Sequence, residues 1–391
     1  MDKSKALIIT NKPIFPSLDG GSVAMRKFTE ALIKNYTLDI IAISKTSNQQ
    51  NKNNQKVNLN EKVSQIIFEK RMSLNFLHIC KSIIYNTSYQ ANRFYSEKIK
   101  LFIQKKIDEE NYKIIIFESI FTTIYLKKIN YKKSTKIILR AHNIEHQIWE
   151  DLARSHWFKK IVFLLLAIQI KKMELNIPKY VDYIFTLSKN DEVFFKKYFP
   201  KKTHNIPVTF KTKEIKNTKI KRSLVYLGAM DWQPNIEGLN WFLKYVLPKV
   251  KKRNENLNIY IGGKNMDNKY LKLNDKNTHI TSKIDNAEEY IKNKEIMFVP
   301  LFSGSGIRIK ILESMALGVP VISTTKGAQG IPYRNGEDII IADDPNDFNN
   351  AIHLLINNDQ LRQRIALNGQ LLIKKHFSQN TVIRQLNEII K

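Results

Sequence analysis

Short apolar runs alternate with longer amphipathic stretches along most of the chain. Runs such as Ala6–Thr10 and Lys113–Phe117 predict buried strands, whereas Val23–Lys34 has apolar residues at helical spacing. This repeated alternation of strand and helix indicates βαβ units and a parallel sheet with helices on both faces. The other strands predicted in the first half are Leu38–Ile43, Gln65–Phe68, Thr135–Leu139 and Tyr183–Leu187, and the other helices are Arg93–Glu109 and Glu145–Asn176.

The same rhythm restarts at Ser223, after a basic, helix-poor tract that contains Pro207. The predicted strands there are Leu224–Leu227, Leu257–Ile261, Ile296–Leu301 and Val319–Ser323, with helices at Ile236–Arg253 and Ile307–Leu317. The fold class is therefore α/β, with two doubly wound, Rossmann-like domains that we expect to face each other across a cleft. The expected divisions are an N-terminal domain (1–210), a linker (211–222), a second domain (223–378) and a C-terminal segment (379–391). Within that segment, Thr381–Ile390 has a helical apolar face and is expected to pack back toward the first domain.

Composition narrows the choice of partners and of compartment. The 64 Lys and Arg residues outnumber the 36 Asp and Glu residues, and 64 − 36 gives a net charge of +28. Such a charge favours a polyanionic neighbour, namely nucleic acid, an anionic membrane or a phosphorylated ligand, although a general bias toward Asn, Lys and Ile is a second explanation. The single cysteine, Cys80, excludes an internal disulfide and a cysteine-based zinc site, and it fits a reducing cytoplasm. The polar stretch Lys45–Lys62 predicts a loop.

The longest apolar run, Ile161–Ile170, has two lysines on each side. A spanning helix needs about 20 apolar residues, and this run has about half that number. Two interpretations remain open. The run is either a buried helix with solvated lysine ends, or a helix that rests on an anionic bilayer through Lys159, Lys160, Lys171 and Lys172. The second interpretation predicts a cytoplasmic protein that is peripheral on the inner membrane face.

The segment Val299–Gly330 is the most informative part of the sequence. A strand ends in a turn of small residues, and a helix follows. Glycines allow a ligand to approach the backbone, and the first helical N–H groups are unsatisfied, so such a turn suits a diphosphate. Arg308 and Lys310, two cations in the first helical turn, can bind an anion between them. Glu313, an acidic residue one turn further along the helix, can reach a ligand hydroxyl. The candidate donor-binding residues here are Gly304, Ser305, Gly306, Ile307, Arg308, Lys310 and Glu313.

This segment closely resembles the nucleotide-sugar site of the family 4 retaining glycosyltransferases, the glycosyl transferases group 1 superfamily with the GT-B fold. The pattern Arg-x-Lys-x-x-Glu-x-Met-Ala-x-Gly-x-Pro-Val matches from Arg308 and continues to Thr324. The resemblance continues in Leu224–Phe242 and Ala342–Ile352, and in the N-terminal half in Pro16–Ser22 and Arg140–Trp149. It therefore covers nearly the whole chain and implies an enzyme of surface-polysaccharide biosynthesis.

The resemblance also implies residue roles. Glu313 matches the second glutamate of the family's Glu-x7-Glu motif, which holds the ribose, and Ser305 stands at the position of the first. Gly228 lies in a donor-binding segment, and Asp19, Gly20 and Gly21 match a loop beside the transferred sugar and the acceptor. His142 matches an active-site histidine at the end of a strand. It would hydrogen bond the donor sugar or shuttle a proton.

A metal site is not expected. His142 and His146 are spaced for one helix face but lack a third ligand, and Asp343 with Asp344 is typical of a helix N-cap. The expected function is transfer of a sugar, with retention, from a nucleoside diphosphate sugar to a growing, often lipid-linked surface glycan, without a cofactor or metal. The expected partners are that donor, that acceptor and an anionic membrane surface, and not nucleic acid, because no nucleic-acid-binding motif occurs. Two alternatives remain: a non-catalytic glycosyltransferase-like subunit, because of Ser305, and a nucleotide-sugar epimerase of the same fold.

Overall fold

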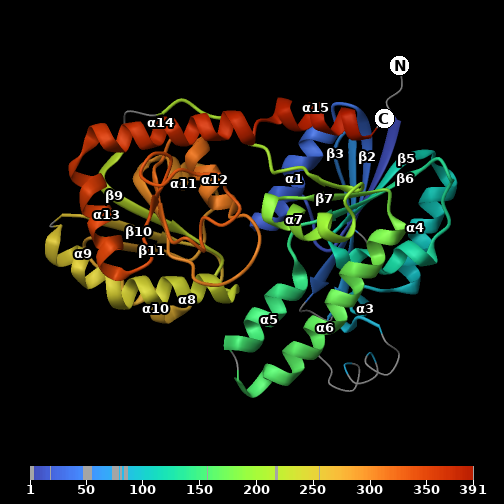
Figure 1. Cartoon of the computed structure of the whole chain (residues 1–391), viewed down its shortest axis with the longest axis horizontal. Coiled ribbons are helices and arrows are strands. Elements are labelled where there is room, and N and C mark those ends of the chain that lie inside the picture. The colour runs from blue at the N-terminus through green and yellow to red at the C-terminus, as the bar shows by residue number, and fades with distance from the viewer. Residues whose placement is uncertain are drawn as a thin grey trace. The chain divides into compact units, whose positions relative to one another are not determined.

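The chain forms two compact units, each built on its own sheet (Figure 1). The first unit comprises Met1–Val208 and Val382–Lys391, and the second comprises Thr209–Thr381. The computed structural model describes residues 4–17, 19–46, 55–72, 79, 82, 87–155, 157–215, 219–254 and 256–390. Cys80 and residues 47–54 of the polar stretch lie outside these ranges.

The first unit contains an eight-stranded sheet in the order β3-β4-β2-β1-β5-β6-β7-β8. Every neighbouring pair is parallel except β3 and β4, which are antiparallel. The strands are β1 (Ser4–Thr10), β2 (Tyr36–Thr46), β3 (Gln55–Asn60), β4 (Val63–Arg71), β5 (Tyr112–Glu118), β6 (Lys136–Ala141), β7 (Tyr183–Thr186) and β8 (Thr203–Asn205).

The central strands β1, β5 and β6 are buried on both faces, which is why they are almost wholly apolar rather than alternating. In β1, Ala6 and Ile8 join the core beneath α1 and α15, whereas Leu7 and Ile9 join the opposite core beneath α4. The helices of this unit are α1 (Gly20–Leu32), α3 (Tyr89–Asn92), α4 (Glu97–Glu109), α5 (Glu145–Ser155), α6 (Lys160–Asn176), α7 (Lys189–Tyr198) and α15 (Gln379–Ile389), with 3-10 turns at Ile120–Lys128, Trp157–Lys159 and Ile177–Tyr180.

The second unit contains a six-stranded parallel sheet in the order β11-β10-β9-β12-β13-β14. Its strands are β9 (Ile220–Leu227), β10 (Asn258–Gly262), β11 (Thr278–Thr281), β12 (Lys294–Val299), β13 (Val321–Ser323) and β14 (Ile340–Ile341). Its helices are α8 (Gln233–Trp241), α9 (Leu247–Arg253), α10 (Asn268–Leu271), α11 (Ala287–Lys292), α12 (Ile309–Ala316), α13 (Pro345–Asn357) and α14 (Asp359–His376), and one π-helical turn, Phe242–Val246, joins α8 to α9. The predicted α/β class with two doubly wound sheets is confirmed.

Each sheet has one point at which its strand order reverses. The chain builds outward from β1 through β2 to β4 and then returns to place β5 on the other side of β1. In the second unit it builds outward from β9 through β10 to β11 and returns to place β12 beside β9. Connections diverge at such a switch point and leave a crevice at the carboxyl ends of the two strands, which is where open α/β sheets bind ligands.

Several details differ from the sequence-based expectations, and strands β3, β8, β11 and β14 were not predicted. Residues 211–222 belong to the second unit, and Ile220–Arg222 already lie in β9, where Ile220 pairs with Lys294 of β12, since backbone pairing does not require an apolar side chain. For the same reason Gln55–Asn60, within the polar stretch, forms edge strand β3. The single helix expected over Glu145–Asn176 is divided into α5 and α6, because the apolar faces of the two halves pack on each other, as Trp149 against Phe163.

Helix α15 closes the core of the first unit. Val382 and Leu386 are buried in the same apolar cluster as Ala31 and Leu32 of α1. In Figure 1, α15 lies beside α1, although the two are separated by almost the whole chain. The C-terminal residues are thus a structural part of the first unit.

Truncation of Leu386 tests this packing. Leu386→Ala should lower the free energy of unfolding by about 2–5 kcal/mol, because it leaves a cavity in the core beneath α1. Leu371→Ala on α14 is the matched control, because Leu371 is 60% exposed, and it should change that free energy by less than about 0.5 kcal/mol. Urea denaturation measures both, and equal small losses would mean that α15 does not seal this core.

Candidate active site

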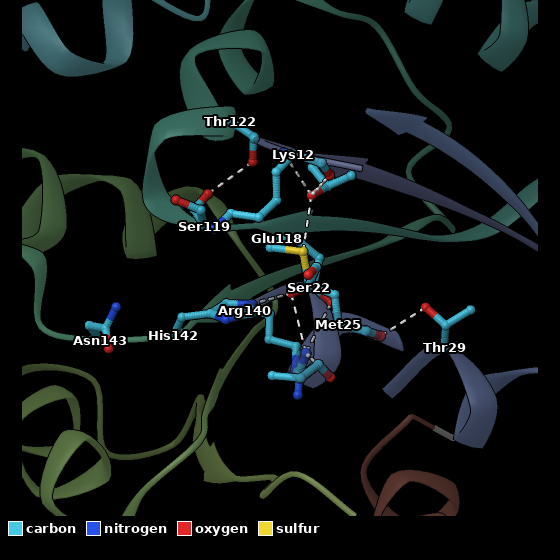
Figure 2. Close-up of polar contacts among 12 residues, drawn as sticks. Lys12, Ser22, Met25, Thr29, Glu118, Ser119, Thr122, Arg140, His142 and Asn143 are labelled. Carbon is cyan, nitrogen blue, oxygen red and sulfur yellow. Dashed lines mark hydrogen bonds and ion pairs between the residues drawn. The ribbon is translucent and has the colours of Figure 1, made fainter. Parts of the chain in front are cut away.

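A buried ion pair lies at the switch point of the first unit. Glu118 ends β5 and Arg140 lies near the end of the adjacent β6, and neither side chain is exposed. Arg140 Nη1 donates to both Glu118 carboxylate oxygens, at 3.2 and 3.3 Å, and lies 3.4 Å from the Ala24 carbonyl oxygen of α1. The guanidinium also lies over the Phe28 ring, 4.1 Å from its centroid. One side chain therefore ties two strand ends to helix α1 (Figure 2).

His142 follows β6 directly and contacts the same carboxylate. Its Nε2 lies 2.5 Å from Glu118 Oε2 (Figure 2). Burial alone would raise the pKa of Glu118, but the Arg140 charge and the His142 contact outweigh it and lower that pKa. Burial lowers the pKa of His142, so the ring is neutral near pH 7. An ionised carboxylate only accepts hydrogen bonds, so His142 carries its proton on Nε2 and presents Nδ1 as an acceptor.

The loop after β1 brings a second charged pair to this edge of the sheet. Lys12 Nζ lies 2.9 Å from Asp19 Oδ2. Asp19 is the N-cap of α1, and its Oδ1 accepts the Ser22 backbone N–H at 2.8 Å. Burial would raise the pKa of Asp19, but Lys12 and these hydrogen bonds together lower it. Gly20 opens the helix, and a Cβ at Gly21 would lie 3.2 Å from Lys12 Nζ, so glycine leaves room for the pair.

The other acidic and imidazole groups nearby have separate partners. His146 Nδ1 hydrogen bonds with Glu174 of α6, so it does not share the carboxylate that holds His142. Burial raises the pKa of Glu145 to about 7. Within the described ranges, no group of three or more His, Cys, Asp or Glu side chains is arranged to hold a metal ion. In the second unit, Asp344 caps α13, and its side chain accepts the backbone N–H groups of Asn346 and Asp347.

In the second unit, Gly228 and Lys310 meet at the carboxyl ends of β9 and β12. Gly228 follows β9, and a Cβ there would lie 2.7 Å from the Tyr226 hydroxyl and 3.0 Å from Asn235 Cγ. Lys310 Nζ donates to Asn235 Oδ1 at 3.0 Å and lies 4.9 Å from the centroid of the Tyr226 ring. Asn235 in turn donates to the Ala229 carbonyl at 2.9 Å, so the lysine is fixed to the turn that follows β9.

Arg308 holds the glycine-rich turn together. Its guanidinium donates to the carbonyl oxygens of Ser305, Gly306 (2.8 Å) and Ser303 (3.3 Å) and lies over the Trp232 ring. It is buried, and its backbone is extended, so α12 begins at Ile309 and Arg308 is the N-cap residue. The helix expected from Ile307 therefore starts two residues later, because the side chain of Arg308 is engaged by the turn. Gly304 and Gly306 have φ of +90° and +79°, which favour glycine.

The remaining candidates of this segment surround the same turn. Burial and the neighbouring Arg308 charge lower the pKa of Lys310 to about 7. Ile307 is buried, and Glu313 lies half-buried one turn along α12. Ser305 Oγ is shielded from solvent and has no hydrogen-bond partner among the described residues. The structure thus gathers the candidates Gly228 and Gly304–Glu313 at one switch point, and Asp19, Gly20, Gly21 and His142 at the other.

Sequence reasoning missed three contributors to these sites: Glu118, Asn235 and Lys12. Glu118 had a visible signal, because it is the one acidic residue that ends the otherwise apolar run Ile114–Glu118. A buried charge is stable only when it is paired with an opposite charge, and the next strand contains Arg140. Asn235 and Lys12 had no such signal, because their partners are distant in the sequence or depend on loop geometry.

Replacing Arg140 alone, and then Glu118 and Arg140 together, measures the contribution of the ion pair to the free energy of unfolding. Arg140→Met should lower the free energy of unfolding by about 3–5 kcal/mol, because it leaves a buried carboxylate unpaired. The double variant Glu118→Leu with Arg140→Met should be more stable than Arg140→Met alone, since no charge remains buried. Urea denaturation compares them, and strictly additive losses would contradict the pairing.

The pH dependence gives an independent check. In the wild type the native pKa of Glu118 lies below its ordinary value of 4.5, so its contribution to stability is present above about pH 4.5 and is lost as the pH falls through the native pKa. In Arg140→Met, burial without the cation should raise that pKa, so stability should instead fall as the pH rises above about 4.5. The same slope in both proteins would show that Arg140 does not set the ionisation of Glu118.

Comparisons with known proteins agree with this architecture. Residues 221–358 match the family model described as "Glycosyl transferases group 1". An uncharacterised 44.6 kDa protein in the cps region of Klebsiella pneumoniae is 27% identical over 288 residues, which are 71% of this chain and 74% of that protein.

Solved structures match over the full length. A mutant of S. aureus TarM, in complex with Fondaparinux, alpha-GlcNAc-glycerol and UDP, has a TM-score of 0.71 and 11% identity and covers 99% of this chain and 100% of its own. Sucrose-phosphate synthase from Thermosynechococcus elongatus has a TM-score of 0.71 and 13% identity, with 98% of each chain covered. This chain therefore has the GT-B fold, and its residues 221–358 are similar to the glycosyl transferases group 1 family.

Proposed function

We propose that this chain transfers a sugar from a nucleoside diphosphate sugar to a growing surface glycan, with retention of the anomeric configuration. The observation that carries the proposal is the cation Lys310, held by Asn235 beside a glycine-rich turn at the switch point of a group 1 glycosyltransferase domain. TarM, which has a similar fold, was solved with UDP, and the Klebsiella relative is encoded in a cps region. These two findings support a uridine nucleotide donor and a polysaccharide acceptor.

The second unit supplies what a diphosphate leaving group needs. When the bond between the anomeric carbon and the diphosphate oxygen breaks, its electron pair stays on that oxygen, and negative charge grows there. Lys310 and the first N–H groups of α12 are suited to stabilise that charge. Arg308 acts as a positioning residue, because its guanidinium holds the carbonyl oxygens of the turn. Burial, together with the Arg308 charge, lowers the pKa of Lys310 to about 7, and a bound anion would favour its charged form.

The first unit supplies an oriented hydrogen-bond acceptor, the His142 ring. Because the Glu118 carboxylate fixes the proton of His142 on Nε2, the Nδ1 lone pair is suited to accept a hydrogen bond from a hydroxyl of the donor sugar. The acceptor hydroxyl forms the new bond to the anomeric carbon and gives up its proton, which the departing diphosphate oxygen is placed to take when the attack comes from the same face. No metal or cofactor enters these steps.

The direct test is a panel of nucleoside diphosphate sugars, beginning with UDP-sugars, assayed with glycan acceptors and with the donor alone. We expect a sugar to move to the acceptor with its anomeric configuration unchanged, as NMR of the product would show. Interconversion of the donor without an acceptor would instead identify an epimerase. Binding of donor without transfer to any acceptor would identify a non-catalytic subunit, for which Ser305 would be the reason.

Lys310 should make nucleotide binding pH-dependent. Since its pKa is about 7 in the free protein, UDP must bind together with a proton at higher pH. Above pH 7.5, where the diphosphate is fully ionised, affinity should therefore fall by up to about tenfold per pH unit. Titration calorimetry in buffers of different ionisation enthalpy would measure both the affinity and the proton uptake.

Lys310→Arg is the matched control, because arginine keeps its charge throughout this range. Its affinity for UDP should be nearly independent of pH between about 7.5 and 8.5, below the range in which the uracil N3–H ionises, with no proton uptake. Uridine, which lacks the diphosphate, should bind wild type and variant equally. A wild-type affinity for UDP that does not change with pH would remove Lys310 from the diphosphate site.

Glu313 is proposed to accept hydrogen bonds from the donor ribose. Glu313→Gln should weaken UDP and uridine binding alike, by about 1.5–3 kcal/mol, because a charged acceptor is replaced by a neutral one. 2′-Deoxyuridine diphosphate completes the test, since the variant should lose its discrimination between the ribose and deoxyribose ligands, and retained discrimination would exclude this role.

A further inference from the structure

Helix α6 is apolar on two opposite faces, and only one of them is covered. On the inner face, Leu166, Ala167 and Ile170 are buried, and Leu166 belongs to a cluster with Ile79 and Tyr89. Gln169 also fastens the helix, because its side chain accepts from the Tyr89 backbone N–H and donates to Ser82 Oγ, both at 3.0 Å. The inner face is therefore fully engaged by the first unit.

The outer face exposes a continuous apolar surface. Ile161 is 75% exposed, Leu164 39% and Ile168 64%, and their spacing places all three on one side of the helix. At the end of α6 that joins α5, Trp157 and Phe158 are 75% and 82% exposed, with ring centroids 3.7 Å apart. In Figure 1, α5 and α6 lie side by side as a helical hairpin. We define the outer surface as Trp157, Phe158, Ile161, Leu164 and Ile168.

Lysines border this surface at both ends. Lys159 and Lys160 are exposed at the start of α6, and Lys171 and Lys172 follow Ile168 at three and four residues, which places them on the same side. From Trp157 to Met173 the sequence contains no acidic residue. Each lysine side chain is long enough to keep its ammonium group in a polar layer while the apolar side chains enter an apolar one.

We propose that the outer surface docks on an anionic lipid bilayer. The aromatic pair and the isoleucines would enter the boundary between headgroups and acyl chains, and the lysines would contact the anionic headgroups. A second copy of this chain fits less well, because the lysines around a symmetric contact would face one another in a protein of net charge +28. No helix among the described residues is long and apolar enough to cross a membrane. The inference rests on the exposed side chains and does not depend on the proposed sugar transfer.

The two interpretations of the run Ile161–Ile170 each describe one face of α6. The run is neither wholly buried nor wholly exposed. Leu166, Ala167 and Ile170 lie on the inner face of α6, whereas Ile161, Leu164 and Ile168 lie on its outer face. Attraction through lysines alone would vanish in concentrated salt, where the Debye length is about 3 Å at 1 M. Attraction that includes inserted side chains would leave a salt-resistant part.

The test is sedimentation of the full chain with vesicles of phosphatidylcholine alone, and of phosphatidylcholine with phosphatidylglycerol in equal amounts. We expect binding to the anionic vesicles, only partly reversed by 1 M salt. Trp157→Ser with Phe158→Ser should weaken that binding at least about tenfold and remove its salt-resistant part. Lys171→Gln with Lys172→Gln should reduce the preference for anionic over neutral vesicles and spare the salt-resistant part.

A matched control lies on α14 in the second unit. Leu367 and Leu371 are 54% and 60% exposed, so Leu367→Ser with Leu371→Ser removes comparable apolar surface elsewhere and should leave vesicle binding unchanged. UDP affinity, measured in the absence of lipid, should be the same in all these variants. A failure of membrane docking is thus distinguishable from a failure of the proposed activity.

Fluorescence locates the contact. Among the four tryptophans, Trp157 is the one that is exposed, so brominated lipids should quench part of the emission in wild type and none of it in Trp157→Phe, which should still bind. Absence of binding to either vesicle, or equal losses in the α14 control, would overturn the proposal. So would a wild-type dimer in sedimentation velocity that becomes monomeric in Trp157→Ser with Phe158→Ser, because the surface would then be an interface between two copies.

Discussion

The first unit depends on one buried interaction, the ion pair between Glu118 and Arg140. Its two side chains are removed from water at the ends of adjacent strands, where an unpaired charge would cost several kcal/mol. The pair therefore constrains β5, β6 and α1 together, because Arg140 also reaches the Ala24 carbonyl and the Phe28 ring. His142 acquires its position and its tautomer from the same carboxylate. A candidate active-site group is thus fixed by an interaction that also holds the fold.

The second unit also places an arginine at its switch point, but the partners of that arginine are different. At its switch point the arginine is engaged by the carbonyl oxygens of its own turn, and the lysine beside it has a pKa lowered to about 7. The arginine therefore shapes the turn, whereas the lysine can change its charge when an anion arrives. The first unit thus presents a histidine oriented by a carboxylate, and the second presents a lysine whose pKa lies near 7.

Helix α6 shows how one apolar run can serve two environments. Its inner residues complete the first unit, and its outer residues remain in contact with water beside four lysines. A membrane-spanning helix would need about twice the apolar length, so this helix can lie on a bilayer without crossing it. The docking proposed for α6 would give part of the positive charge of the chain a local use.

The sequence by itself determined the α/β class, ten of the fourteen described strands and the glycine-rich turn with Arg308, Lys310 and Glu313, because hydrophobic periodicity and turn chemistry are local properties. Some local features still escaped, such as β3, whose pairing uses the backbone and leaves no mark in its polar side chains. Only the tertiary structure decided that Arg308 supports the turn while Lys310 titrates, that Glu118 orients His142, and that one face of α6 stays uncovered. Each of these depends on burial and on partners distant in the sequence, such as Asn235 for Lys310 and Tyr89 for Gln169, and residue spacing along the chain contains no information about such contacts.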